Sequence, residues 1–213
     1  MEIKWHGHSC FEITSEEGMV IVTDPYSEGY GYPVPELTAD IVTVSHEHRD
    51  HNNVAAIKGE PEVVKGAGEH ICKGMRFYGV KTYHDTSSGA ERGENTAFLF
   101  DVDELRLCHL GDLGQVLEAS QLRSIKEKDV DVLFIPVGGV YTIDAKGANE
   151  VLGQLEPKIA IPMHYKTPPL RLNIQKVDPF LKGKTRVIRE KRLVVRKEDL
   201  PEEPEIVVLD WRH

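Results

Sequence analysis

The chain has 213 residues, of which 40% are hydrophobic and 29% are charged, and its formal net charge is −9. This length suffices for one sizeable core, and we expect a single domain over residues 1–213. Its apolar runs are far shorter than the roughly 20 residues of a membrane-spanning helix, and its N-terminus lacks the pattern of a signal peptide. The composition excludes a disordered chain and predicts a cytoplasmic protein without a membrane span.

The excess of acidic residues limits the partners that the protein can bind. Its 35 acidic and 26 basic side chains would on average repel a phosphate backbone, so nucleic acid is a disfavoured partner. In the basic segment 182–197 the charges alternate with Val, Ile and Leu, which is typical of a strand with a charged solvent face. Cys10, Cys72 and Cys108 are widely spaced, which predicts buried core residues and neither a disulfide nor a thiolate metal site.

The first quarter of the chain predicts strands around an irregular loop. Short alternating segments in residues 2–23 predict a strand followed by a hairpin. Residues 25–37 are rich in Pro, Gly and Tyr, which indicates a long loop. The β-branched run at residues 40–45 then predicts a buried strand, and this strand ends directly before His46.

Strands and helices alternate along the rest of the chain. A short helix is expected at residues 52–59, and further strands are expected at 62–66, 75–84, 95–103 and 104–111. Helical spacing predicts helices at 114–129 and 144–157, each followed by an apolar strand, at 130–139 and 158–165, and two or three more strands at 185–211. This order predicts an α/β fold in which two mixed β-sheets are flanked by helices, a four-layer αββα sandwich.

A dense group of metal-ligand residues follows the strand at 40–45. His46, His48, Asp50 and His51 fall within six positions, and imidazole together with carboxylate suits zinc, iron, manganese or nickel better than calcium or magnesium. His46 and His48 can point to one side of an extended turn, while Asp50 and His51 address a second point nearby. The run therefore predicts two adjacent divalent metal ions, with Zn²⁺ as the first choice and Mn²⁺, Fe²⁺ or Ni²⁺ as alternatives.

This HxHxDH run resembles the signature of the metallo-β-lactamase superfamily. The resemblance extends over nearly the whole chain, because YHDTSS supplies His84, HLGD supplies Asp112 and PMHYKT supplies His164, each after a predicted strand. It implies that Asp112 bridges two metals, one held by His46, His48 and His84 and the other by Asp50, His51 and His164. It also implies that Asp50 orients a metal-activated hydroxide and relays its proton as a general base.

The third ligand of the first metal has two candidates. His109 lies three residues before Asp112 and would point from the same strand end. We prefer His84, because it follows an alternating run and begins a loop of small residues, whereas His109 lies inside a strand, where a packed histidine is ordinary.

Several residues near the motifs could serve the site less directly. His8 resembles a position near the N-terminus of lactonase-like members, and a contact to the ligands or substrate competes there with a structural role. Tyr165 and Lys166 could contact an anionic substrate. Gly138 and Gly139 could let the backbone approach a substrate or the metals, but a tight strand-to-helix turn explains them as well, and we interpret them as a turn. We expect structural or exposed histidines at the remaining positions, which are His6, His70 and His213.

Within the superfamily the motifs look most like the small, undecorated hydrolases related to L-ascorbate-6-phosphate lactonase. The resemblance implies a metal-dependent hydrolase that acts on a small-molecule ester, lactone or phosphodiester. One alternative is a nuclease, which the acidic composition and the short chain disfavour. Another is a protein that binds metal without turnover, which the presence of Asp50 disfavours because a sensor could dispense with a proton-handling residue.

Overall fold

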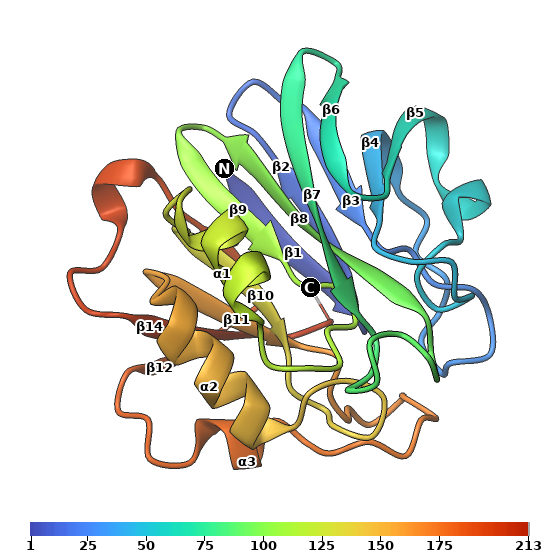
Figure 1. Cartoon of the computed structure of the whole chain (residues 1–213). Coiled ribbons are helices and arrows are strands. Elements are labelled where there is room, and N and C mark those ends of the chain that lie inside the picture. Colours follow the sequence, from blue (N-terminus) through green and yellow to red (C-terminus); the bar gives the residue numbers. More distant parts are fainter. Residues whose placement is uncertain (213) are drawn as a thin grey trace.

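The computed structural model describes residues 1–212 and contains two mixed β-sheets that face each other (Figure 1). One sheet has the strand order β13-β1-β2-β3-β4-β5, and the other has the order β12-β14-β11-β10-β9-β8-β7-β6. The strands are β1 (Glu2–Gly7), β2 (Cys10–Thr14), β3 (Val20–Thr23), β4 (Thr38–Val44), β5 (Lys58–Lys65), β6 (Gly68–Cys72), β7 (Met75–Tyr83), β8 (Glu94–Val102), β9 (Leu105–His109), β10 (Val132–Pro136), β11 (Ile159–Met163), β12 (Val187–Glu190), β13 (Arg192–Val194) and β14 (Glu205–Leu209). The helices are α1 (Ala119–Lys126), α2 (Ala145–Leu155) and α3 (Asp178–Leu181).

The strand directions bring six strand ends together. In the six-stranded sheet, β1 and β3 are both antiparallel to β2, and β4 is parallel to β3, so β1, β3 and β4 run in the same direction. In the eight-stranded sheet, β7 and β9 are both antiparallel to β8, and β9, β10 and β11 are parallel. The residues that follow β1, β3 and β4 therefore emerge from one edge of their sheet, and those that follow β7, β9 and β11 emerge from one edge of the other.

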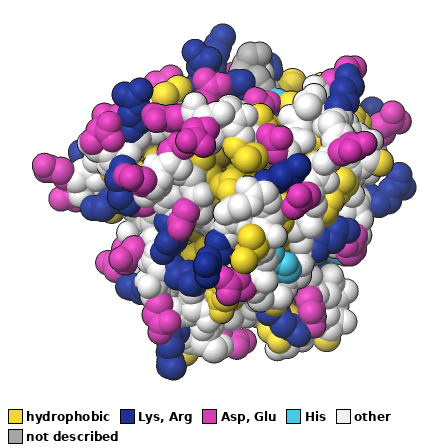
Figure 2. Space-filling view, turned by 90° about the horizontal axis from the view of Figure 1, so that it is seen from above, with side chains coloured by type: hydrophobic (Ala, Val, Ile, Leu, Met, Phe, Trp, Pro, Cys, Tyr) yellow, Lys and Arg dark blue, Asp and Glu magenta, His cyan; other side chains and the backbone are white. Residues whose placement is uncertain are grey.

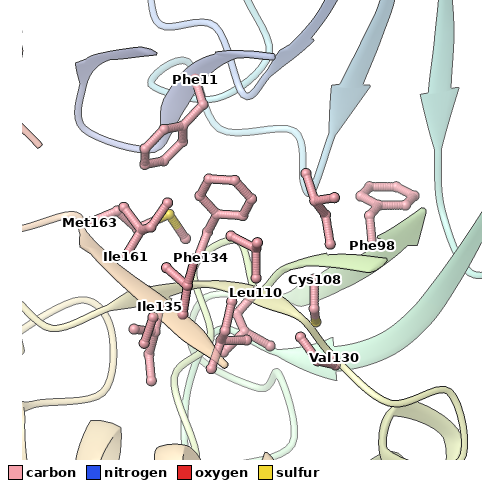
Figure 3. Close-up of a cluster of buried hydrophobic side chains, with 14 of the residues drawn as sticks. Phe11, Phe98, Cys108, Leu110, Val130, Phe134, Ile135, Ile161 and Met163 are labelled. Carbon is pink, nitrogen blue, oxygen red and sulfur yellow. The ribbon is translucent and has the colours of Figure 1, made fainter. Parts of the chain in front are cut away.

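The core lies between the two sheets. Phe11 on β2 faces Phe134 on β10, with ring centroids 4.6 Å apart, and Met163 on β11 lies beside them (Figure 3). This packing follows from the sequence, because alternate residues of a strand point to opposite faces and the inward-facing ones here are large and apolar. Cys10, Cys72 and Cys108 are buried and unpaired, as expected.

The two-sheet α/β architecture is confirmed, and its outer layers differ from each other. Helices α1, α2 and α3 lie along the outer face of the eight-stranded sheet (Figure 1). The outer face of the six-stranded sheet is covered by a second apolar cluster, to which the loop after β3 contributes Tyr26 and Tyr32, and the loop after β11 contributes Leu170. The helix expected at residues 52–59 is reduced to a 3₁₀ turn at Val54–Ala56, because β5 already begins at Lys58.

The basic segment 182–197 departs from the single strand predicted for it. Its first part forms β12, which pairs with β14, and its second part forms β13, which pairs with β1 in the other sheet. Both strands are short and largely exposed, and each forms an edge of its sheet.

The surface carries charges of both signs. Acidic and basic side chains are interspersed over the face shown in Figure 2, without an extended basic area on that face. Among residues 1–212, no helix combines the length and the apolar character that a membrane crossing requires.

Candidate metal centre

The predicted ligands are brought together at the strand ends. His46, Asp50 and His51 follow β4, and the others follow β7, β9 and β11 as His84, Asp112 and His164. Three groups of side chains place one ligand atom each within 4.8 Å of one another: His46 with His48 and His84; His46 with His51 and Asp112; and His8 with Asp50, His51 and His164. Side chains separated by up to 156 positions therefore share one small volume.

A single carboxylate oxygen lies at the middle of this cluster. Oδ2 of Asp112 is 3.2 Å from Nε2 of His51, 3.3 Å from Nε2 of His84 and 3.2 Å from Nε2 of His164. Asp112 itself is buried. Such a carboxylate, surrounded by imidazoles from three strand ends, is a candidate cation ligand.

The buried ligand atoms fit cation binding. Nε2 of His51 and Nε2 of His164 are buried and lie 3.2 Å from Oδ2 of Asp112 without forming a hydrogen bond, and the buried Oδ1 of Asp112 has no hydrogen-bond partner within residues 1–212. Nε2 of His46 and Nδ1 of His48 face each other at 3.0 Å. A buried polar atom without a partner costs about 1–3 kcal/mol, and a cation would satisfy the nitrogen lone pairs and the carboxylate together.

The pKa values in the cluster reflect its burial and its charges. Burial lowers the pKa of His46 to about 3, so this imidazole is neutral at pH 7 and can donate its lone pair. Burial opposes ionisation of Asp112, but His164 and His51 hold the pKa of this carboxyl well below its usual value. Burial likewise disfavours a charge on His51, yet Asp112 and Asp24 raise the pKa of His51. A cation bound at His51 would therefore displace a proton.

Asp24 supports the turn after β4 that carries His46, Asp50 and His51, a role that was not predicted from the sequence. It follows β3, is fully buried and adopts a positive φ of 39°. Its Oδ1 accepts the main-chain N–H of Ser45 at 2.8 Å, and its Oδ2 accepts the hydroxyl of Ser45 at 2.6 Å and pairs with Nδ1 of His51 at 2.9 Å. These bonds leave Nε2 of His51 to face the centre of the cluster. The available signal was an aspartate at the end of a buried apolar strand, immediately before Pro25.

Asn95 on β8 supports Asp112 in a similar way. Its Oδ1 accepts the main-chain N–H of Asp112 at 2.9 Å, and its Nδ2 donates to the carbonyl of Leu110 at 2.9 Å. The turn that carries the bridging candidate is thus tied to the neighbouring strand, which fixes the direction of its carboxylate.

The structure places the two candidates for the third ligand differently. His84 lies in the cluster, whereas the imidazole of His109 is bonded to the backbone on both sides: Nε2 lies 3.0 Å from the carbonyl oxygen of Ser9, and Nδ1 accepts the N–H of Gly111 at 3.2 Å. Both ring nitrogens of His109 are therefore engaged away from the cluster.

Alanine at each position tests the assignment. His84→Ala is expected to reduce bound metal, because it removes one of three imidazole nitrogens that lie within 4.8 Å of one another. His109→Ala is expected to lower the melting temperature through the cavity that it leaves, but to retain the metal content of the wild type. Metal per chain, measured by elemental analysis of each variant, checks this. Equal loss from both variants would contradict the choice of His84.

The secondary candidates fall into two groups. His8 belongs to the cluster: it follows β1 at a positive φ of 54°, its Nε2 is 3.2 Å from Oδ2 of Asp50, and its ring centroid is 4.0 Å from that of His164. Tyr165 and Lys166 are engaged elsewhere. The ring of Tyr165 packs on Trp5 at 5.0 Å, and Nζ of Lys166 donates to main-chain carbonyls of the following loop. These two side chains follow His164 in sequence without joining it at the cluster.

The remaining histidines have other contacts. Nε2 of His6 lies 3.1 Å from Oε2 of Glu12, and Nε2 of His70 lies 2.9 Å from the carbonyl oxygen of Gly66. His213 is outside the described residues.

The glycine at position 138 permits a close approach to a ligand. A methyl group added to Gly138 would lie 2.1 Å from the main-chain oxygen of His164, which is closer than nonbonded atoms can come. The sequence analysis interpreted the glycine pair as a turn; the structure adds that Gly138 lies close to the backbone of a candidate ligand.

Gly138→Ala is therefore expected to displace His164 and to lower both melting temperature and metal content, since overpacking of this kind costs about 1–3 kcal/mol. Gly153→Ala is the matched control, because Gly153 lies on the exposed side of α2 with nothing within 4 Å of an added methyl group. It should leave metal content unchanged and could only favour the helix. Identical behaviour of the two variants in thermal unfolding and elemental analysis would argue against a positioning role for Gly138.

A pocket of about 450 Å³ lies against two residues of the cluster. His46 and His48 line it on the side of the cluster, and His48 is exposed. A small molecule could therefore reach the ligand atoms from this side.

Comparison with known proteins places the chain in a family. Residues 2–164 match the model of the β-lactamase superfamily domain. A UPF0173 metal-dependent hydrolase of Thermoplasma volcanium is 30% identical over 206 residues, which cover 84% of this chain and 88% of the relative. The corresponding protein of Carboxydothermus hydrogenoformans is 32% identical over 200 residues, covering 80% and 87%.

A solved structure from Thermotoga maritima, assigned as a zinc-dependent hydrolase of the metallo-β-lactamase superfamily, is 40% identical and superposes with a TM-score of 0.82, covering 98% of this chain and 97% of that one. Sequence and fold thus agree over nearly the full length. The chain belongs to the metallo-β-lactamase superfamily and, within it, to the UPF0173 family of metal-dependent hydrolases.

Proposed function

We propose that the protein is a hydrolase that binds two adjacent divalent cations and cleaves a small-molecule ester, lactone or phosphodiester. The observation that supports this most directly is the convergence of three imidazole nitrogens on one buried oxygen of Asp112, at 3.2–3.3 Å. Zn²⁺ suits this mixture of imidazole and carboxylate, and Mn²⁺, Fe²⁺ and Ni²⁺ fit the same donors.

The ligand groups suggest how the cations are shared. His46, His48 and His84 would hold one cation, and Asp50, His51 and His164 the other, with Asp112 between them. His8 belongs to the second group by position, and its bond to Asp50 makes it a residue that orients this carboxylate. When bound, the cations would lower the pKa of a water molecule and polarise the scissile carbonyl or phosphoryl group.

Asp50 is the residue that would handle the proton. Burial would raise the pKa of Asp50, but the bond to His8 and the nearby His51 hold the pKa of this carboxyl below its usual value, so it is ionised at pH 7. Asp50 is partly exposed, in contrast to Asp112, and Oδ2 is fixed by Nε2 of His8 at 3.2 Å. Its carboxylate can therefore accept a proton from the attacking water and pass it to the leaving group or to solvent.

Small-molecule substrates fit the observations better than nucleic acid does. The pocket of about 450 Å³ is in the range of small-ligand sites, and the chain carries a formal net charge of −9. A nuclease would need a basic surface for the phosphate backbone.

The proposal is tested by metal analysis followed by activity assays. The purified protein is expected to contain divalent metal, and a panel of lactones, thioesters and phosphodiesters is expected to include substrates whose hydrolysis stops with a chelator and resumes when Zn²⁺ or Mn²⁺ is added back. Hydrolysis that continues in metal-free protein would contradict the proposal. So would metal-loaded protein that cleaves nothing in the panel.

A further inference from the structure

The pocket beside the candidate metal centre has a wall of charged side chains. Glu47, Lys65, Arg92 and Glu94 line it together with His46 and His48. A substrate whose scissile bond lies at the cluster could extend into this pocket, so the charges there bear on which substituents the substrate carries.

Arg92 is the cation of this wall that lacks a close carboxylate. Nζ of Lys65 pairs with Glu47 at 2.8 Å, and Glu94 is bonded to Lys81. The nearest carboxylate oxygen to the Arg92 guanidinium belongs to its neighbour Glu91, at 3.8 Å, which is beyond hydrogen-bond distance. Among the described residues that line the pocket, Arg92 therefore has N–H donors available for a ligand.

The backbone that carries Arg92 is held firmly. Asp85, a buried carboxylate directly after His84, accepts the main-chain N–H of Arg92 at 2.8 Å. It also accepts three further N–H groups of the same loop, those of Ser87, Gly89 and Glu91, at 2.7–3.0 Å. One carboxylate thus fixes the loop relative to a candidate metal ligand, and Arg92 is placed at a set distance from the cluster.

The guanidinium is held on the other side by an aromatic ring. The Cζ atom of Arg92 is 5.7 Å from the centroid of Tyr141, which belongs to the loop that begins at Gly138 beside His164. The residue before Tyr141 is Val140, an exposed, β-branched residue with a positive φ of 62°. A β-branched residue seldom adopts this conformation, and such strain is concentrated at functional sites. One loop beside Arg92 thus starts at a candidate ligand, His84, and the other approaches the backbone of His164; both are constrained in shape.

We propose that Arg92 binds an anionic substituent of the substrate, a carboxylate or a phosphate group that is separate from the scissile bond. This inference rests on the proposed hydrolase function and narrows its substrate class to negatively charged esters and lactones. A planar guanidinium with free N–H groups matches two oxygens of a carboxylate or phosphate, and the ring of Tyr141, 5.7 Å from Cζ, restricts the positions that the guanidinium takes.

The test compares matched esters that share a leaving group and differ in one substituent, which is neutral, a carboxylate or a phosphate. The wild type is expected to prefer one of the anionic esters. In Arg92→Ala, KM for that ester should rise about 10- to 100-fold, the effect of losing hydrogen bonds to a charged group, while kcat/KM for the neutral ester stays within about 3-fold. Arg92→Lys should restore part of the preference. The ester whose KM rises most in Arg92→Ala identifies the substituent that Arg92 binds.

A control variant and a binding measurement test whether the effect is specific to Arg92. Arg76→Ala removes an exposed arginine paired with Glu69 outside the pocket and should not change the preference. Isothermal titration of Zn²⁺-loaded protein with inorganic phosphate is expected to show about 10-fold weaker binding to Arg92→Ala than to the wild type.

An unchanged preference for anionic esters in Arg92→Ala, or an equal loss on neutral and anionic esters, would overturn the role of Arg92 and leave the proposed hydrolase function standing. If the metal-loaded wild type hydrolysed none of the esters, the proposed function would fail, and the phosphate titration would decide the Arg92 inference: equal affinities of wild type and variant would overturn it.

Discussion

Replacing Asp112 with asparagine is expected to cost the protein most of its bound metal and all measurable hydrolysis. The substitution keeps the volume of the side chain and removes the negative charge that three imidazoles surround at 3.2–3.3 Å. Loss of a residue that only supports a metal ligand already weakens metal binding about 10- to 100-fold. Loss of the bridging candidate itself should weaken metal binding by more than about 100-fold. Metal per chain after dialysis, measured by elemental analysis, checks this.

The thermal stability of this variant gives an independent readout. Because a bound cation stabilises the folded state by mass action, a chelator should lower the melting temperature of the wild type and leave that of Asp112→Asn nearly unchanged. Asp101→Asn, on the exposed side of β8, is the control and should respond to the chelator as the wild type does. An Asp112→Asn protein that binds two metals with unaltered affinity would refute the bridging role.

Replacing Asp50 with alanine is expected to separate metal binding from turnover. Asp50 is the partly exposed carboxylate of the cluster, and its Oδ2 is held by His8 instead of being surrounded by several imidazoles as in Asp112. We therefore expect the variant to retain bound metal through His51, His164 and Asp112, while kcat falls about 10²- to 10⁴-fold, the usual contribution of a general base. Metal content and steady-state kinetics on any substrate found in the screen measure the two effects.

The same variant distinguishes an enzyme from a protein that only binds metal. Unchanged turnover in Asp50→Ala would remove Asp50 from the mechanism, and complete loss of metal would make it chiefly a ligand. The second outcome would leave the proton-handling residue to be found elsewhere in the cluster.

The ligand run was predictable because it is local. His46, His48, Asp50 and His51 lie in one turn, and the strand before them is recognisable by its β-branched residues. His84, Asp112 and His164 were added from the resemblance to the metallo-β-lactamase superfamily, and each of them follows a strand. The two-sheet fold was predictable from the order of strand and helix patterns along the chain.

What the sequence could not show depends on contacts between distant segments. An aspartate after one strand is indistinguishable from an ordinary turn residue, and the role of Asp24 is visible only through its bonds to residues 21 and 27 positions later. Tyr165 and Lys166 were attractive because they follow His164 in sequence. However, His164 adopts a positive φ of 50°, and the chain beyond it turns towards Trp5 and the following loop.

The division of segment 182–197 between two sheets was hidden for a similar reason. Its alternation of charged and apolar residues is the same in β12 and β13, and which sheet edge each part joins depends on where β14 and β1 lie. Arg92 and Tyr141 are likewise 49 positions apart, and nothing local to either residue pairs them.

Anomalous diffraction from crystals of the metal-loaded protein would locate the bound cations. We expect two adjacent peaks that share Asp112, one beside His46, His48 and His84 and the other beside Asp50, His51 and His164. A single peak, or metal bound away from Asp112, would contradict this arrangement.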